Sequence, residues 1–367
     1  MTNNAFLHVS DAFIEENKLW MLTKEADALC KFDLENGTME KCYYLPTGVQ
    51  FEYGHLVMRN IDNYIYILPF NDSHMYCFEK DKESFRELEI ICDGNDMLQN
   101  QKCRIIGCYD NKIVLITNDA KDILFIDQDS LETTKISGHI SEMSNQGINV
   151  ESNIFSDCYL QQKNMLYVPI YMHSYILAVD MDKQTYKLHC LSKDKKIKLR
   201  TIDKGLEENQ FLLTTTDNER IIWSLNDGIK SIYKFKNTNR VGRYVRAYSL
   251  NDAYYYIPTH ERKIYVERDG DVSEIPFKYP DMGDYAEYEF TQYECIFCHD
   301  GKIYIQARSN GAFYVLDPKG DNVVDLNIGI PVENKSKLIK DSYEVRGIPD
   351  IIWESYGLEL SDYLKII

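Results

Sequence analysis

The stretch Asn63-Tyr-Ile-Tyr-Ile-Leu, with a second apolar run that ends at Glu79, sets the pattern of the chain. It joins two runs rich in β-branched and aromatic residues through a short polar segment, which is the length and composition of a β-hairpin. Six other segments repeat this pattern, each with a closing residue 16 positions after the opening Asn, Asp or Gly. They run from Asn17 to Asp33, Asn111 to Asp127, Asn164 to Asp180, Asn209 to Leu225, Asp252 to Arg268 and Gly301 to Asp317.

The connections between these hairpins vary in length, whereas the hairpins do not. Successive opening residues are 46, 48, 53, 45, 43 and 49 positions apart. A further apolar run precedes each hairpin, as in 103–108, and another follows it, as in 85–90. Four strands in a period of about 40 to 50 residues are typical of a propeller blade. We therefore predict an all-β chain, a seven-bladed β-propeller of four-stranded antiparallel blades over residues 1–330.

Other architectures fit the pattern less well. No long helical periodicity supports an α/β fold, and the coils of a β-helix are shorter than these repeats. A count of six or eight blades would require the repeat to be misaligned with the sequence at one end of the chain. The apolar run Phe6–Val9 is predicted to add a strand to the first or last blade and so close the fold.

The composition changes in residues 331–367, which we predict to be a short helical C-terminal tail packed on the propeller. Asp350 and Ser361 have the character of helix N-caps. Leaving Ile351, Ile352 and Trp353 in water would be unfavourable, by about 1.5 to 3 kcal/mol each. These side chains are expected to pack on the propeller itself or on another protein.

The repeat resembles the WD40-like, YVTN-like and kelch-like β-propeller superfamily, and the resemblance covers the architecture only. No repeat of the chain combines the Gly-His and the Trp-Asp of WD40 repeats, and the chain lacks the double glycine of kelch repeats. The resemblance implies a scaffold that binds proteins or ligands on one face, and less often a lyase or hydrolase.

Composition limits the classes of partner. The formal net charge of −17 and a pI near 5.0 disfavour nucleic acid, which such a field repels. The first residues do not have the pattern of a secretory signal, and no apolar run is long enough to span a membrane. Ten cysteines at irregular spacing fit reduced thiols. We expect a cytoplasmic, monomeric protein without a cofactor, and we predict neither a catalytic residue nor a metal ligand.

Polar residues just before each hairpin are where a propeller would build a site, because the first strands of the blades line the central channel. Counting back seven positions from each opening residue, with small shifts allowed, selects both cations and carboxylates. The predicted ligand-binding residues are Arg59, Arg104, Asp157, Arg200, Arg243, Arg246, Tyr293 and Glu294. Their arginines could hold a carboxylate or phosphate by paired hydrogen bonds. Alternatively, the set is an internal network of ion pairs that neutralise one another.

Three other sequence patterns have a structural interpretation. The segment from Tyr279 to Glu294 interleaves acids with tyrosines, a composition that suits an interface or a sugar-stacking surface. Alternatively, this segment covers the adjoining blades. Cys295-Ile-Phe-Cys298-His299 has the spacing of a haem attachment site, but side chains alternate along a strand, so we predict packing instead. The recurring closing carboxylates, such as Asp33 and Asp127, are expected to stabilise turns.

The sequence favours a non-catalytic binding or scaffold propeller that recognises a protein, a peptide or a small anionic ligand at the mouth of the channel. Enzymatic activity stays open. One alternative is a lyase or hydrolase acting on an anionic substrate, with Arg104, Arg200 or Arg246 as the anchor. Another is carbohydrate binding by tyrosine stacking.

Overall fold

The structure, a computed structural model, falls into two compact units. Residues 1–89, 98–100 and 279–367 form the first unit, and residues 90–97 and 101–278 form the second. The described residues are 4–46, 55–69, 74–92, 95–96, 103–117, 122–150, 155–156, 158–193, 195–235, 244–259, 261–277, 293–308, 310–326 and 328–345.

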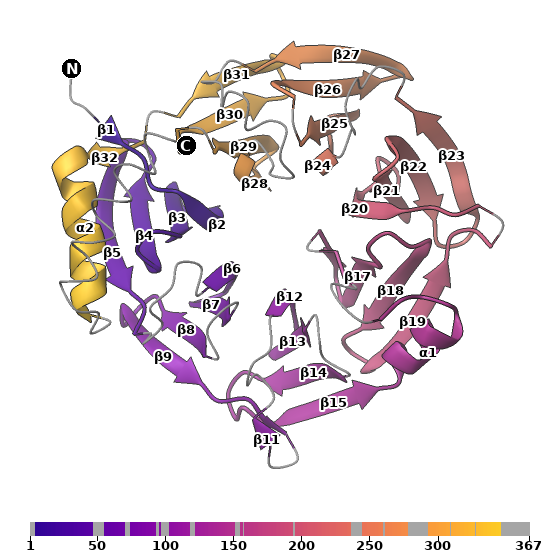
Figure 1. The fold of residues 1–367 in the computed structure, drawn as a ribbon, viewed down its shortest axis with the longest axis horizontal. Coiled ribbons are helices and arrows are strands. Elements are labelled where there is room, and N and C mark those ends of the chain that lie inside the picture. Colours follow the sequence, from indigo (N-terminus) through magenta and orange to yellow (C-terminus); the bar gives the residue numbers. More distant parts are fainter. Residues whose placement is uncertain are drawn as a thin grey trace. The chain divides into compact units, whose positions relative to one another are not determined.

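The first unit contains three four-stranded antiparallel sheets (Figure 1). Blade 1 consists of β2 (Val9–Glu15), β3 (Lys18–Thr23), β4 (Ala28–Asp33) and β5 (Thr38–Tyr44). Blade 2 consists of β6 (His55–Ile61), β7 (Tyr64–Pro69), β8 (Met75–Glu79) and β9 (Ser84–Leu88). Blade 7 consists of β28 (Tyr293–His299), β29 (Lys302–Ala307), β30 (Phe313–Asp317) and β31 (Asn322–Asp325).

The second unit contains four more such sheets and a short hairpin of β10 (Ile91–Cys92) and β11 (Asn95–Asp96). Blade 3 comprises β12 (Cys103–Tyr109), β13 (Lys112–Thr117), β14 (Asp122–Asp127) and β15 (Thr133–Ser137). Blade 4 comprises β16 (Leu160–Gln162), β17 (Met165–Pro169), β18 (Tyr175–Asp180) and β19 (Thr185–Cys190). Blade 5 comprises β20 (Leu199–Lys204), β21 (Gln210–Thr215), β22 (Glu219–Ser224) and β23 (Gly228–Lys234). Blade 6 comprises β24 (Tyr244–Leu250), β25 (Ala253–Pro258), β26 (Lys263–Arg268) and β27 (Asp271–Pro276). The predicted fold class, a seven-bladed β-propeller, is confirmed.

The opening residues of the repeat lie in the turns between the first and second strands. Glu16 and Asn17 both have positive φ (46° and 61°), as do Asp110 and Asn111 (47° and 61°). Two-residue turns of this kind match the twist of antiparallel strands, and Asn, Asp and Gly tolerate this backbone best. The need for a left-handed backbone therefore explains why these residue types recur.

The closing carboxylates stabilise turns, as predicted. Asp33 Oδ1 accepts the backbone N–H groups of Glu35 at 2.8 Å and Asn36 at 2.9 Å, and Asp127 Oδ1 does the same in blade 3. In blade 5 the pairing of Gln210 with Ser224 shows that the hairpin closes one residue before Leu225.

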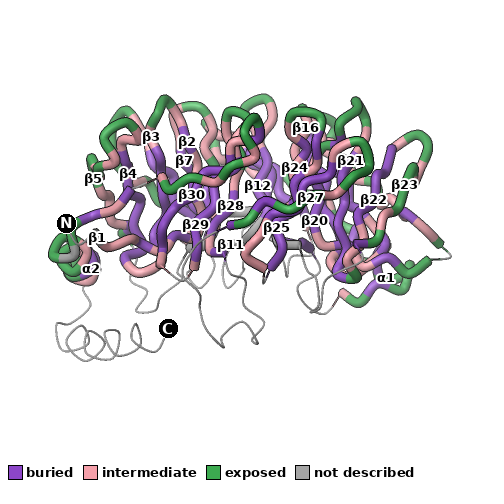
Figure 2. The backbone as a smooth tube through the Cα atoms, turned by 90° about the horizontal axis from the view of Figure 1, so that it is seen from above, coloured by how far each residue is buried: buried purple, intermediate pink, exposed green. Residues whose placement is uncertain are grey.

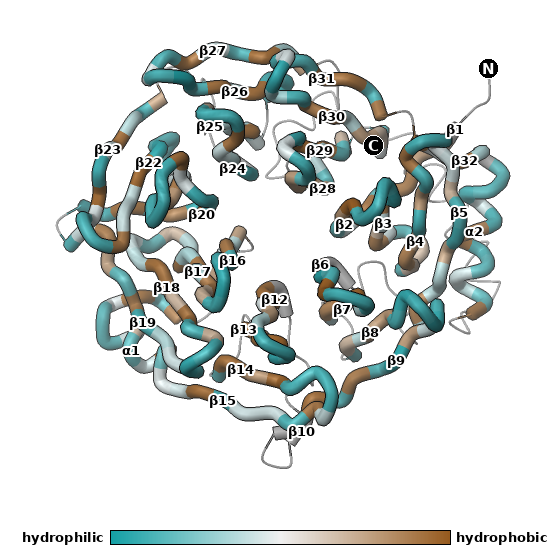
Figure 3. The backbone as a smooth tube through the Cα atoms, turned by 180° about the vertical axis from the view of Figure 1, so that it is seen from behind, coloured by the Kyte–Doolittle hydropathy of each residue, from teal (hydrophilic) through white to brown (hydrophobic). Residues whose placement is uncertain are grey.

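The middle strands of the blades carry the core. Second strands such as β3 and β21 are buried at five successive positions, so both faces of the sheet are covered there. The outer strand β5 has only half-buried and exposed residues. Buried residues accordingly follow the strands, and exposed residues gather in the turns (Figure 2). Hydropathy is distributed in the same way, with hydrophilic residues in the turns (Figure 3).

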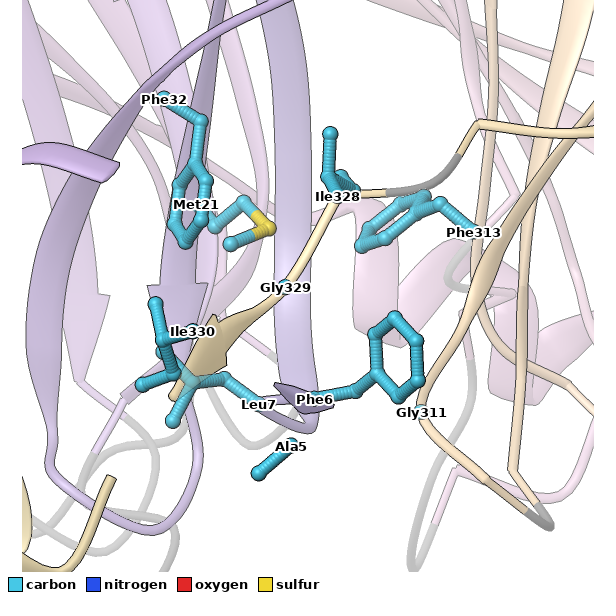
Figure 4. Close-up of a pocket in the computed structure, with 10 residues that line it drawn as sticks. All are labelled: Ala5, Phe6, Leu7, Met21, Phe32, Gly311, Phe313, Ile328, Gly329 and Ile330. Carbon is cyan, nitrogen blue, oxygen red and sulfur yellow. The ribbon is translucent and has the colours of Figure 1, made fainter. Parts of the chain in front are cut away.

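The segment before blade 1 and the segment after blade 7 lie side by side. β1 (Asn4–Ala5) pairs with β32 (Ile330–Pro331), forming a separate two-stranded sheet. Each of these blades has four strands of its own, so the prediction that Phe6–Val9 adds a strand to one of them was wrong. The apolar pocket between these segments is lined by Phe6, Phe313 and Ile330 among others (Figure 4).

One buried side chain, Gln306 of β29, joins blade 7 to the N-terminal segment. Its Nε2 donates to Leu7 O at 2.6 Å and to Gly311 O at 2.8 Å, and its Oε1 accepts the N–H of Val9 at 3.0 Å. Gly311 has φ 69°, and a Cβ there would lie 2.9 Å from Phe6 Cβ, so glycine is required. Gln306 satisfies backbone groups that strand pairing would otherwise satisfy.

Two helices accompany the blades in the described part of the chain. α1 (His139–Asn145) lies in the longest connection, between blades 3 and 4. α2 (Val332–Val345) packs Leu338 and Ile339 into the core around blade 1, and its Ser342 hydroxyl donates to Ala26 O. α2 confirms the predicted helical C-terminal tail, although its position within residues 331–367 was not predicted. The helices expected at Asp350 and Ser361, with the apolar residues 351–353, lie outside the described residues.

A buried ion pair links blades 5 and 6. Arg220 of β22 is 8% exposed and Glu267 of β26 is 3% exposed. Arg220 Nε donates to Glu267 Oε2 at 3.1 Å, Arg220 Nη2 contacts Glu267 Oε1, and the Tyr256 hydroxyl donates to Glu267 Oε2 at 2.7 Å. Removing either charge would leave its partner buried without this opposite charge.

We therefore expect Arg220→Met or Glu267→Leu alone to lower the free energy of unfolding by about 3 to 5 kcal/mol. The double variant should cost less than the sum of the two, because it leaves neither charge alone in the core. Urea denaturation of wild type, the two single variants and the double variant measures this coupling. Lys263→Ala with Glu274→Ala, an exposed pair of blade 6, is the control and should couple by less than about 1 kcal/mol. Additive losses at Arg220 and Glu267 would contradict the prediction.

Candidate functional site

A β-bulge recurs in the first strand of six blades. The pairing register between first and second strands shifts by one residue, so a single residue is left without a partner position. The bulged residues are Ser10, Leu56, Arg104, Arg200, Val245 and Glu294. These are the positions found by counting back from the hairpins, except in blade 5, where the count gave Ile202. The five-residue connection between β20 and β21 moves the bulge to Arg200.

The structure divides the predicted site residues between the two units. Arg200 in β20 and Arg246 in β24 belong to the second unit, as does Arg104, whose backbone lies in β12. Arg59 in β6 is exposed, Tyr293 in β28 is buried, and Glu294 follows it in the first unit. Asp157 and Arg243 lie outside the described residues, and so does the acidic and aromatic segment up to residue 292.

Arg246 and Arg200 are connected through the residues that precede β16. Arg246 Nη1 donates to the Sγ of Cys158, which is 4% exposed. The Cys158 N–H donates to Ser156 Oγ at 3.1 Å, and that hydroxyl donates to Arg200 O at 2.6 Å. The Arg200 guanidinium lies 5.3 Å from the centroid of the Tyr171 ring. Both arginines are half-buried, so their positions are constrained while part of each side chain remains exposed.

A carboxyl group with a perturbed pKa lies on the same first strands. Asp203 of β20 accepts backbone N–H groups of Lys204, at 2.8 Å, and of Ser249 in β24. Burial raises the pKa of Asp203 to about 6, and these hydrogen bonds and the charges of Lys204 and Arg246 oppose that shift. Perturbed carboxyl groups beside cations are typical of functional sites. Sequence reasoning missed Asp203 and Cys158, since neither occupies the bulge position.

The bulge residue of blade 7 lies among cations. Glu294 contacts Lys24 Nζ, its Oε1 lies 3.0 Å from Arg308 Nε, and His8 Nδ1 lies 3.9 Å from the same oxygen. Burial and the nearby cations Lys335, Lys24 and Arg308 lower the pKa of His8, although Glu25 opposes them. In the first unit, charges on blades 1 and 7 thus neutralise one another, as in the alternative that the sequence left open.

The cysteine motif of β28 has the geometry of a packed strand. Cys295 is buried and Cys298 is exposed, as expected for side chains on opposite faces. Among the residues that the structure describes, there is no cluster of three or more potential metal ligands. In the same residues, no helix is long and apolar enough to cross a membrane.

No family model matches the chain, and no curated protein matches its sequence. Solved structures do match its fold. It is similar to the WD40 repeats of RRP9 (TM-score 0.57, 8% identity, covering 83% of this chain and 88% of that one). It is also similar to Hsv2 of Kluyveromyces lactis (0.55, 8%, 86% and 96%) and to BamB from Moraxella catarrhalis (0.53, 10%, 84% and 84%). At these identities the likeness shows the fold alone.

The Asp203 carboxyl predicts a pH-dependent stability. Its pKa is about 6 in the folded chain and near 3.8 when unfolded, so the folded state favours the protonated acid. The stability that this proton provides is complete below pH 3.8 and is lost as the pH rises through 6. The amide of Asp203→Asn does not titrate, so the stability of this variant does not fall in this way as the pH rises. We expect this variant to gain about 1 to 3 kcal/mol over wild type between pH 4 and pH 7.5.

Urea denaturation of both proteins at the two pH values measures this gain. Asp217→Asn, in the exposed turn between β21 and β22 of the same blade, shows the effect of removing a surface carboxyl group. A difference between Asp203→Asn and wild type that stays constant across this range would contradict the prediction.

Proposed function

We propose that the protein is a binding propeller whose second unit recognises a carboxylate group through Arg200 and Arg246. The observation that carries the proposal is the chain of contacts from Arg246 through Cys158 and Ser156 to Arg200. It fixes the Arg246 guanidinium group against Cys158 and reaches the backbone of Arg200 on the adjoining first strand. Tyr171 lies against the Arg200 guanidinium group. A carboxylate takes paired hydrogen bonds from a guanidinium group, which favours this ligand chemistry over a neutral one.

The net negative charge of the chain also bears on where an anionic ligand would bind. The chain carries 41 Lys and Arg against 58 Asp and Glu, so most of its surface repels anions. Two half-buried arginines are an exception to that field. Tyr171 lies against the Arg200 guanidinium group and restricts its motion. An anionic ligand would therefore be attracted to these two arginines.

The experiment compares wild type with the double variant Arg200→Glu, Arg246→Glu. Citrate binding is followed by calorimetry, and proteins retained from a lysate are identified by mass spectrometry. Hydrogen bonds to charged groups contribute about 1.5 to 3 kcal/mol, so we expect citrate affinity or partner capture to fall at least about tenfold. Lys230→Glu, with the same charge change on the outer strand β23 of blade 5, should bind as wild type does.

The two arms distinguish the source of the carboxylate. Loss of citrate binding alone indicates a small ligand, and loss of a captured protein alone indicates an acidic segment of a partner. Arg200→Gln with Arg246→Gln repeats the test without introducing new carboxylates, should the first variant unfold. Equal binding by wild type and both double variants would contradict the proposal.

Asp203 favours a second candidate, a lyase or hydrolase at the same first strands. A carboxyl group whose pKa is about 6 can donate or accept a proton near neutral pH, and Arg246 would hold the anionic substrate. This candidate requires turnover that Asp203→Asn abolishes while citrate still binds. The carbohydrate alternative rests on residues 279–292, outside the described part of the chain. The cytoplasmic location and the monomeric state also remain predictions.

A further inference from the structure

Two cysteines face each other across the outer pair of strands in blade 1. Cys30 of β4 and Cys42 of β5 are directly paired in the antiparallel register. Their Sγ atoms lie 3.1 Å apart, with Cys30 as hydrogen-bond donor to Cys42. Both are free thiols. The arrangement places two oxidisable sulfur atoms within reach of each other.

The backbone there already has the geometry that a disulfide requires. Opposite residues of antiparallel strands have Cα atoms about 4.5 to 5.5 Å apart, inside the range of about 4.4 to 6.8 Å seen in disulfides. The flanking pairs, Leu29 with Tyr43 and Lys31 with Lys41, keep the register continuous through the cysteines. A bond length of about 2.05 Å therefore requires only that the two Sγ atoms approach by about 1 Å.

The two thiols differ in their access to solvent. Cys30 is fully buried, whereas Cys42 is half-buried on the outermost strand of the blade. The hydrogen bond to Cys42 and burial both raise the pKa of the Cys30 thiol, so it stays protonated. An oxidant from solvent therefore meets Cys42 first, and Cys30 is the neighbour that reacts with the product.

We propose that Cys30 and Cys42 form a reversible oxidation site, closed to a disulfide by hydrogen peroxide and reopened by a small thiol. Peroxide transfers one oxygen to Cys42, giving a sulfenic acid and one water. The Cys30 sulfur then attacks the Cys42 sulfur, the S–O bond breaks, and the hydroxyl group leaves with the Cys30 proton as a second water. The two thiols lose two electrons and two hydrogens in total, and one peroxide becomes two waters.

The chain provides an internal comparison. Cys295 and Cys298 are closer in sequence, but they lie on opposite faces of β28, one buried and one exposed. Proximity in sequence without a facing geometry should not give a disulfide between them. Exposed Cys298 should instead be oxidised singly.

The test oxidises the full, reduced chain with hydrogen peroxide, blocks the remaining thiols with iodoacetamide and digests it with trypsin. We expect a product in which peptide 25–31 is joined to peptide 42–59, with a mass about 2 Da below the sum of the two. Dithiothreitol should separate the peptides and restore both thiols. No product should join Cys295 to Cys298.

Two variants show the order of the steps. In Cys30→Ser, Cys42 should accumulate sulfenic and sulfinic acids, because the resolving thiol is missing. In Cys42→Ser, Cys30 should stay reduced under the same treatment. If wild-type Cys42 is over-oxidised while Cys30 remains a free thiol, or if Cys42 is joined to another cysteine, the proposal is overturned.

Discussion

The structure depends on the need of each blade for an apolar neighbour on both faces. Second and third strands such as β3 and β4 are buried at nearly every position, which a sheet with one solvated face would not allow. Within the second unit, blades 4 and 5 obtain these neighbours from the blades before and after them in the sequence. Blades 1 and 7 lie at opposite ends of the chain, and the buried amide of Gln306 binds the segment that leads into blade 1. Lys335 of α2 reinforces this junction by donating to Phe6 O and Glu25.

The first strands have a different role, because their bulges free single residues from the regular ladder. The consequence differs between the two units. Around Glu294 the cations of blades 1 and 7 neutralise the carboxylate, so the charges serve the junction. Around Arg246 the partners are a thiol and the Asp203 carboxyl group, whose pKa is raised by burial and only partly lowered by Arg246. The raised pKa of Asp203 and the position of Arg246 are the reasons for proposing an anion site in the second unit.

The bulge positions could be anticipated from the hairpin pattern, since the bulge keeps a constant distance from the opening residue in most blades, but Arg246 lies one position after the bulge of its blade. Arg200 fell outside the count because the connection after β20 is longer, and only allowed shifts in register recovered it. Asp203 and Cys158 had no sequence signal. A carboxyl group on a strand and a cysteine before one are common, and their importance comes from contacts with residues 46 and 88 positions away, Ser249 and Arg246.

The sequence by itself determined the blades, because the residues that specify each hairpin are close together in the chain. Alternating apolar runs, left-handed turns at Asn17 or Asn111, and carboxylates such as Asp33 that accept the next N–H groups all act within about 20 residues. Tertiary structure decided how β1 pairs with β32 and where α2 packs. Cys30 and Cys42 are only 12 positions apart, but the register shift between Lys31 and Phe32 decides that they lie opposite each other. Gln306 bonds to Leu7 across 299 positions, and such a contact depends on the packing of complete sheets, which no local pattern encodes.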